Sequence, residues 1–202
     1  MKFRAHVISV SLALAFAANA YAITPAYEFT GSSMASDPNP YSLGFEFSLS
    51  GTTSIYALAY FNDGTASDHQ VGLWDTAGHL LASTTVHSSD TLNGHFNYAA
   101  ITTLTLSAGN YVIGGTYLGG AAPAPINLTG VTSAAGYSWV RDLQLSGTGL
   151  SFPTQNIGNY GQNGIAVVNF SVTAVPEPET YAMLIAGLAL SGVVLRRRKS
   201  QA

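Results

Sequence analysis

The sequence predicts an all-β protein, an antiparallel β-sandwich of the jelly-roll or immunoglobulin-like type, followed by a C-terminal transmembrane helix. Three observations predict it. Short runs with apolar residues at alternate positions recur, separated by turns rich in Gly, Asn and Asp. Residues 23–175 carry no amphipathic helical stripe of useful length, and one apolar run near the C-terminus ends in a basic cluster. These observations do not choose between the two sandwich topologies.

The clearest predicted strand is 43–49, where every second residue is apolar and would face the core, while Glu46 and Ser48 would face away. Residues 55–61 are apolar throughout, as in a strand buried on both faces, and a turn at 62–64 follows. Residues 70–74 and 80–86 flank a turn at 75–78 and predict a hairpin. Further strands are predicted at 102–106, 111–113 and 165–172.

Two Gly-rich and Pro-rich or Asn-rich stretches, 118–129 and 147–164, are predicted to be long loops. Loops on a rigid sandwich often carry binding surfaces. Residues 23–175 are long enough for a single domain, and the chain contains no cysteine, so stability is expected to come from the core.

The N-terminus has the pattern of a secretory signal peptide over residues 1–22. Lys2 and Arg4 precede an uncharged apolar stretch, and Ala20 and Ala22 form an A-x-A cleavage site. The alternative is a buried first helix. The signal peptide predicts export through the Sec translocon.

The C-terminus carries a proline-glutamate-proline motif (Pro176, Glu177, Pro178), an apolar run at 180–195 and a basic stop made of Arg196, Arg197, Arg198 and Lys199. Residues 176–202 thereby resemble the PEP-CTERM sorting signal of Gram-negative bacteria. That resemblance implies processing by an exosortase-type membrane protease and a mature protein at the cell surface or outside the cell. A permanent anchor, a buried helix and a lipid-anchor attachment signal are the alternatives.

The apolar run is short for a membrane span, because 16 residues rise only about 24 Å against a hydrocarbon core of about 30 Å. Snorkelling arginines and local thinning of the bilayer would compensate. By the positive-inside rule the basic stop stays in the cytoplasm, so the helix would be a transient anchor in the inner membrane with residues 23–175 outside.

Charge argues against nucleic acid as a partner. Residues 23–175 contain Arg141 as their one Lys or Arg, against eight acidic residues, which gives a net charge of −7 with neutral histidines. Phosphate binding requires clustered basic residues.

No metal site is predicted. The histidines at 69, 79, 87 and 95 match no ligand motif, and His79 and His87 would lie at opposite ends of one strand. Asn62, Asp63 and Asp68 offer oxygen ligands for calcium, but Asn-Asp-Gly is above all a turn sequence and the spacing is not that of an EF-hand.

The sequence also predicts no enzyme, since it lacks a G-x-S-x-G elbow, a cysteine and an assignable carboxylate pair. Tyr137 and Trp139, placed in a loop-rich region, are candidate glycan contacts on an exposed platform, whereas Trp74 is expected to be buried.

A second resemblance covers segments 59–64, 69–75, 80–83 and 106–113, which are similar to a β-sandwich domain of unknown function in bacterial surface proteins. It implies a fold and no catalytic residue. Together with the sorting signal, it leads us to expect a non-enzymatic surface or matrix protein associated with biofilm exopolysaccharide. A carbohydrate-binding module and a secreted hydrolase are the alternatives.

Overall fold

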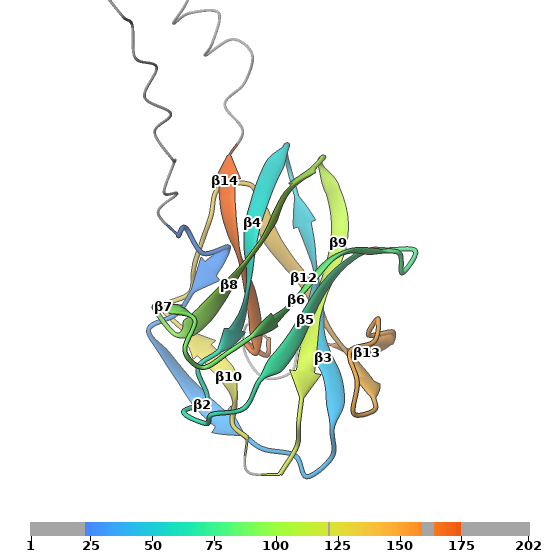
Figure 1. The fold of residues 1–202 in the computed structure, drawn as a ribbon. Helices are drawn as coiled ribbons and strands as arrows, with labels where there is room; N and C mark the ends of the chain where they lie inside the picture. The colour runs from blue at the N-terminus through green and yellow to red at the C-terminus, as the bar shows by residue number, and fades with distance from the viewer. Residues whose placement is uncertain (1–22, 121, 159–163, 175–202) are drawn as a thin grey trace, which may run out of the picture.

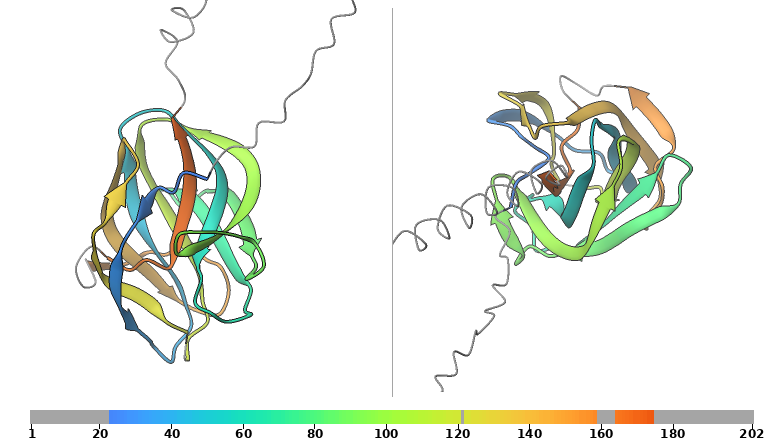
Figure 2. Two further views of the ribbon diagram at one scale, coloured as in Figure 1. Left: turned by 90° about the vertical axis from the view of Figure 1, so that its left-hand side faces the viewer. Right: turned by 90° about the horizontal axis from the view of Figure 1, so that it is seen from above.

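The computed structural model describes residues 23–120, 122–158 and 164–174, and their regular structure consists of strands (Figure 1). A six-stranded sheet in the order β13-β12-β3-β9-β5-β6 packs against a four-stranded sheet in the order β14-β4-β8-β7, with all pairs antiparallel (Figure 2). The predicted antiparallel sandwich is confirmed. The strands are β1 (Tyr27–Glu28), β2 (Gly31–Ala35), β3 (Tyr41–Leu49), β4 (Thr53–Phe61), β5 (His69–Asp75), β6 (Leu80–Val86), β7 (Thr91–Asn93), β8 (Phe96–Leu106), β9 (Gly109–Tyr117), β10 (Ala124–Thr129), β11 (Thr132–Ser133), β12 (Tyr137–Ser146), β13 (Gln155–Gly158) and β14 (Val168–Ala174).

The core lies between the two sheets and is built from alternate residues of their strands. Leu43, Phe45 and Phe47 of β3 are buried on the inner face, as their spacing predicts. Phe47 meets Phe170 of β14 with ring centroids 4.6 Å apart, which joins the two layers directly. Burial of these apolar side chains is the main force that holds the sandwich together.

The chain changes sheets repeatedly, so most neighbouring strands are distant in sequence. β3 and β5 belong to the six-stranded sheet, whereas the intervening β4 belongs to the other. β9 lies between β3 and β5, with Ile113 opposite both Phe45 and Leu73. Strand pairing therefore depends on long-range contacts, which a local sequence pattern does not specify.

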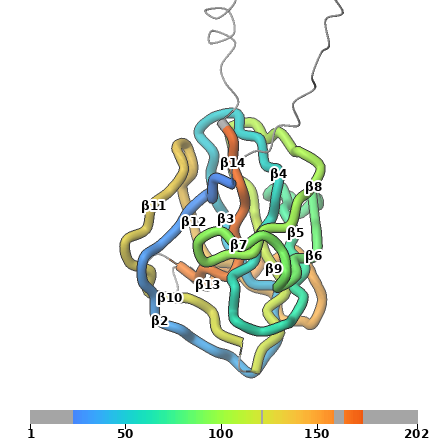
Figure 3. Tube along the Cα trace, turned by 60° about the vertical axis from the view of Figure 1, so that its left-hand side comes forward, coloured from blue at the N-terminus to red at the C-terminus, as the bar shows by residue number. Residues whose placement is uncertain are grey.

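The N-terminal segment extends the smaller sheet past β14 (Figure 3). Pro25 bridges Ser171, and the Ala26 amide donates to the carbonyl of Phe170 at 2.8 Å. The same segment then pairs with β11 through β1 and with β10 through β2. None of these N-terminal strands is predicted by the sequence.

Two predicted turns form as expected. Gly64 follows β4 and has a φ angle of 77°. Gly78 lies in the turn between β5 and β6 and has a φ angle of 89°. Both angles lie in the region that favours glycine. The hairpin of β5 and β6 is thereby confirmed.

The two predicted long loops are partly wrong, because each contains a strand. β10 occupies 124–129 although it contains Pro125. A proline is tolerated in this strand because β10 pairs with β2 alone among the described strands, so one of its edges needs no backbone donor. β13 occupies 155–158 and forms an edge of the six-stranded sheet. Short polar edge strands have little apolar alternation to reveal them.

The described ranges contain no helix long and apolar enough to cross a membrane. The predicted transmembrane run at 180–195 and the signal peptide at 1–22 lie outside these ranges, so both remain predictions.

Candidate functional site

Four side chains form a row across the outer face of the six-stranded sheet, the face directed away from the second sheet. In the strand register Trp74 lies opposite Val112, Val112 opposite Glu46, and Glu46 opposite Arg141. They come from β5, β9, β3 and β12, which are neighbours in space and distant in sequence. The long-range pairing therefore assembles the row.

Glu46 is the centre of a polar network on this face. Its side chain is only 8% exposed, and Arg141 binds its Oε2 through Nη2 at 2.6 Å and through Nε at 2.8 Å. Asn110 donates from Nδ2 to Oε1 at 2.8 Å. Charge-assisted hydrogen bonds of this kind are short and strong, so the carboxylate is held in one orientation.

The next row along the same face is a row of glycines. Gly72, Gly114 and Gly44 lie opposite one another on β5, β9 and β3. A Cβ at Gly72 would collide with the indole of Trp74, and one at Gly114 would come within 3.2 Å of Pro153. The missing side chains leave a trough in which these two rings lie.

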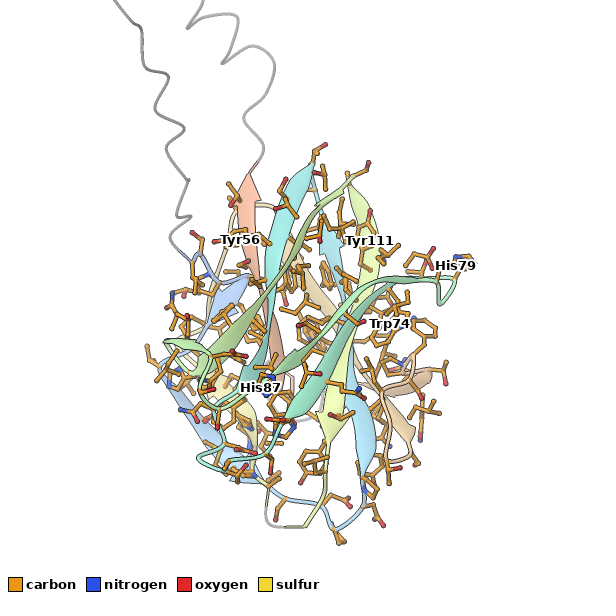
Figure 4. The ribbon with its side chains drawn as sticks, viewed as in Figure 1. Tyr56, Trp74, His79, His87 and Tyr111 are labelled. Carbon is orange, nitrogen blue, oxygen red and sulfur yellow. The ribbon has the colours of Figure 1, made fainter. Side chains whose placement is uncertain are left out.

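Trp74 is buried, as predicted, but on the outer face rather than between the sheets. It is 4% exposed and its ring centroid lies 6.0 Å from that of Phe152 (Figure 4 labels Trp74). The segment that covers it is tied to the sheet by Ser42, whose Oγ donates to the carbonyl of Gly149 at 3.1 Å and accepts from the Ser151 amide at 2.7 Å.

A cavity of about 250 Å³ opens beside this segment. Buried Val112, Glu46 and Leu143 are among its lining residues, and the half-buried ring of Phe152 also faces it. Pro153 and the exposed residues Thr76, Arg141 and Thr154 complete the lining. An aromatic ring, hydroxyl groups and an oriented ion pair thus meet in one hollow, which suits a small polar ligand.

The two predicted glycan contacts, Tyr137 and Trp139, do not form an exposed platform. Although the surrounding region is rich in predicted loops, both lie on a strand, β12, where a bulge between Trp139 and Arg141 interrupts the alternation that would reveal it. Tyr137 is 8% exposed, and burial together with the charge of Asp142 raises the pKa of its hydroxyl well above the usual range.

Tyr137 and Trp139 instead line an inner pocket of about 270 Å³ next to Tyr27 and Phe45. Two polar groups of this pocket, those of Tyr27 and Trp139, are already bonded to protein atoms. The Tyr27 hydroxyl donates to the carbonyl of Val168 at 2.7 Å, and Nε1 of Trp139 donates to Asp142 at 3.3 Å. The inner pocket is therefore less suited to hydroxyl-rich ligands than the outer cavity.

The four histidines within residues 23–174 lie in four separate pairs with carboxylates. Three pairs are short: His79 with Asp75 at 2.8 Å, His87 with Asp68 at 2.7 Å, and His95 with Glu28 at 2.6 Å. The fourth, His69 with Asp63, is buried at 3.5 Å. His79 and His87 lie at opposite ends of the β5–β6 hairpin (Figure 4), and the described residues contain no group of three metal-ligating side chains.

The candidate calcium ligands serve other partners. Oδ1 of Asp63 accepts hydrogen bonds from the amide and the hydroxyl of Thr65 at 2.8 and 2.7 Å, as an aspartate in a tight turn commonly does. Asp68 is paired with His87. Asn62 accepts a hydrogen bond from Gly64 at 3.3 Å.

Residues 28–161 match the family described as a domain of unknown function, DUF4082. The chain belongs to the DUF4082 family. The match extends from the end of β1 past β13, so it contains every residue of the outer cavity but not β14, which supplies Phe170 to the core. No curated protein and no solved structure matches the chain.

The DUF4082 domain is followed by a second match, the PEP-CTERM protein-sorting motif, over residues 174–199. Both predicted resemblances are thereby confirmed, and the motif indicates an exported protein sorted by an exosortase. The named residues of that signal (Pro176, Glu177, Pro178, Arg196, Arg197, Arg198 and Lys199) and of the N-terminal cleavage site (Ala20 and Ala22) lie outside the described ranges.

Part of the outer cavity could be anticipated from this DUF4082 sequence. The alternation of β3 places Glu46 on the outer face, and Arg141 is conspicuous as the one Lys or Arg among residues 23–175. The sequence does not show that Glu46 and Arg141 form an ion pair, because the strand that carries Arg141, β12, is not predicted. Nothing in the sequence around Phe152 signals that it lies against the same face.

Proposed function

We propose that the mature protein is a non-catalytic component of the cell surface or extracellular matrix, delivered by Sec and an exosortase and retained among exopolysaccharides of a biofilm. The observation that carries the proposal is the sorting motif at 174–199 directly behind a DUF4082 sandwich. Before processing, a C-terminal helix at 180–195 holds the protein transiently in the inner membrane.

The surface chemistry of the domain supports a neutral, hydroxyl-rich environment. With one arginine and eight acidic residues, residues 23–175 repel acidic polymers at long range. The abundant Ser, Thr and Asn side chains, together with backbone N–H and C=O groups, interact with hydroxyl groups by neutral hydrogen bonds.

A non-catalytic role is supported by the separation of the titratable groups. Each histidine in the described part of the chain is engaged with its own carboxylate, and Glu46 accepts three hydrogen bonds or ion-pair contacts that hold it. General acid–base catalysis instead brings such groups together around one reacting atom.

A secreted hydrolase is the alternative function. A panel of glycoside, ester and peptide substrates tests it, and turnover of any of them by the purified chain would exclude the non-catalytic role.

Sorting is tested by replacing Pro176, Glu177 and Pro178 with alanine in the native host. We expect the folded body to persist, but its intact mass and its distribution between membrane and extracellular fractions to change, because the prolines keep the approach to the membrane extended. The matched control replaces three polar residues of the preceding body, Thr132, Ser133 and Ser138, which are exposed. An unaltered mass and location would exclude exosortase sorting of this chain.

A further inference from the structure

We propose that the outer cavity over β3, β9 and β12 is a binding site for a neutral sugar unit of a polysaccharide. The inference rests on the proposed function and deepens it, because it names the matrix component and the residues that hold it. The site differs from the inner pocket of Tyr137 and Trp139, which is lined by Phe45 and by residues of β1, β10 and β11.

The first argument is the combination of surfaces in one hollow. A sugar ring presents an apolar C–H face and a rim of hydroxyl groups, so it needs an apolar ring beside donors and acceptors. Phe152 offers the ring, and the hydroxyl groups of Thr76 and Thr154 lie on the exposed rim. At about 250 Å³, the cavity has the volume of about eight water molecules at ~30 Å³ each, which one sugar unit can displace.

The second argument is the unused donor capacity of Arg141. Its Nε and Nη2 are directed at Glu46, and no described residue accepts a hydrogen bond from Nη1. The side chain is 47% exposed. A guanidinium fixed on one side by a carboxylate and open on the other has two N–H donors for ligand oxygens at little further entropic cost.

The third argument excludes an acidic ligand. The charge of Arg141 is balanced by Glu46 within the same network, so the cavity has no net positive charge to attract a carboxylate or a phosphate. The rest of the domain is acidic and repels such groups. A neutral sugar does not meet this repulsion.

The fourth argument is preorganisation. Phe152 packs on Gly78, where a Cβ would come within 3.1 Å of its ring, and Pro153 packs on Gly114. Ser42 fixes the preceding turn through two hydrogen bonds. The wall of the cavity is therefore already in place, and binding does not have to order a loop.

The test uses the full chain, purified in a detergent without a sugar head group. Maltohexaose, cellohexaose and mannohexaose are the neutral probes and an alginate oligomer is the acidic probe, each titrated by calorimetry. We expect at least one neutral probe to bind and the alginate oligomer not to bind. In Phe152→Leu, which keeps apolar cover over Gly78 but removes the ring, the affinity should fall by about tenfold or more.

A second variant and a control allow the proposal to be tested even if Phe152→Leu does not fold. The double substitution Thr76→Val with Thr154→Val replaces two hydroxyl groups with methyl groups of similar size at exposed positions and should also weaken binding. Trp139→Phe in the inner pocket is the matched control and should leave it unchanged. Absence of binding to all neutral probes, preferential binding of alginate, or loss of binding in Trp139→Phe alone would each overturn the proposal. Normal processing of the tail in the same protein would show that the sorting proposal still holds.

Discussion

The two faces of the six-stranded sheet are made by the same strands and yet follow different rules. On the inner face, large apolar residues such as Phe45 and Phe47 alternate regularly and pack on the second sheet. On the outer face, a row of glycines lies next to a row that holds an ion pair and a tryptophan. The comparison teaches that the inner face specifies the fold, whereas the outer face shapes a hollow.

The difference follows from what covers each face. The inner face is covered by a whole sheet, so any apolar residue of suitable volume contributes to burial. On the outer face the 149–154 segment packs over the glycine row, and the fit there depends on particular small residues beneath particular rings. Substitutions should therefore have different consequences on the two faces.

The largest effect is expected on the inner face. Phe47 is fully buried and its ring lies within 6.2 Å of those of Phe170, Tyr137 and Phe45. Phe47→Ala should lower the free energy of unfolding by about 3–5 kcal/mol through lost burial and a residual cavity, as measured by urea denaturation. The neighbouring Ser48→Ala is the control and should change it by less than about 0.5 kcal/mol. Equal effects at the two positions would contradict the proposed division between the faces.

An intermediate effect is expected in the glycine row. Gly72→Val would insert a side chain where the indole of Trp74 lies, so we expect a loss of about 1–3 kcal/mol from overpacking. In a Trp139→Phe background, which leaves Trp74 as the single tryptophan, the emission maximum should also shift to the red as the indole becomes exposed.

Gly51→Val is the matched control for Gly72→Val, because a Cβ at Gly51 would meet no atom within 4 Å. If Gly72→Val left both the stability and the emission of Trp74 unchanged, the glycine trough would not be needed for the outer face.

The smallest effect is expected at the exposed edge, away from both faces. The hydrogen bond that the His87 ring donates to the Asp68 carboxylate and, to a smaller extent, the negative charge of Asp68 raise the pKa of His87 above its usual value. The pair therefore favours the folded state below the unfolded pKa of about 6.5, and this contribution is lost as the pH rises through the higher folded pKa. Because the pair is exposed, its effect on stability should be slight.

This edge prediction is checked by NMR titration of the His87 ring. In Asp68→Asn the pKa of His87 should return toward the usual value, whereas Asp75→Asn, which removes the carboxylate paired with His79 instead, should leave the pKa of His87 unchanged. A pKa of His87 that did not respond to Asp68→Asn would show that the pair does not form in solution.

The sequence by itself determined the class of fold, the clearest strand, the hairpin of β5 and β6 and the family and sorting signal. Each of these features produces a local sequence pattern, such as the alternation in 43–49 or Gly78 in a turn, so neighbouring residues are sufficient to predict it.

Only the tertiary structure decided that Glu46 meets Arg141, that Trp74 lies under Phe152, and that Tyr137 and Trp139 are on a strand rather than in a loop. The physical reason is that these contacts depend on which strands become neighbours. In a sandwich whose chain changes sheets repeatedly, that choice is made by the summed burial of residues far apart in sequence. The sequence next to an outer-face residue does not identify the residue that will lie opposite it on the neighbouring strand.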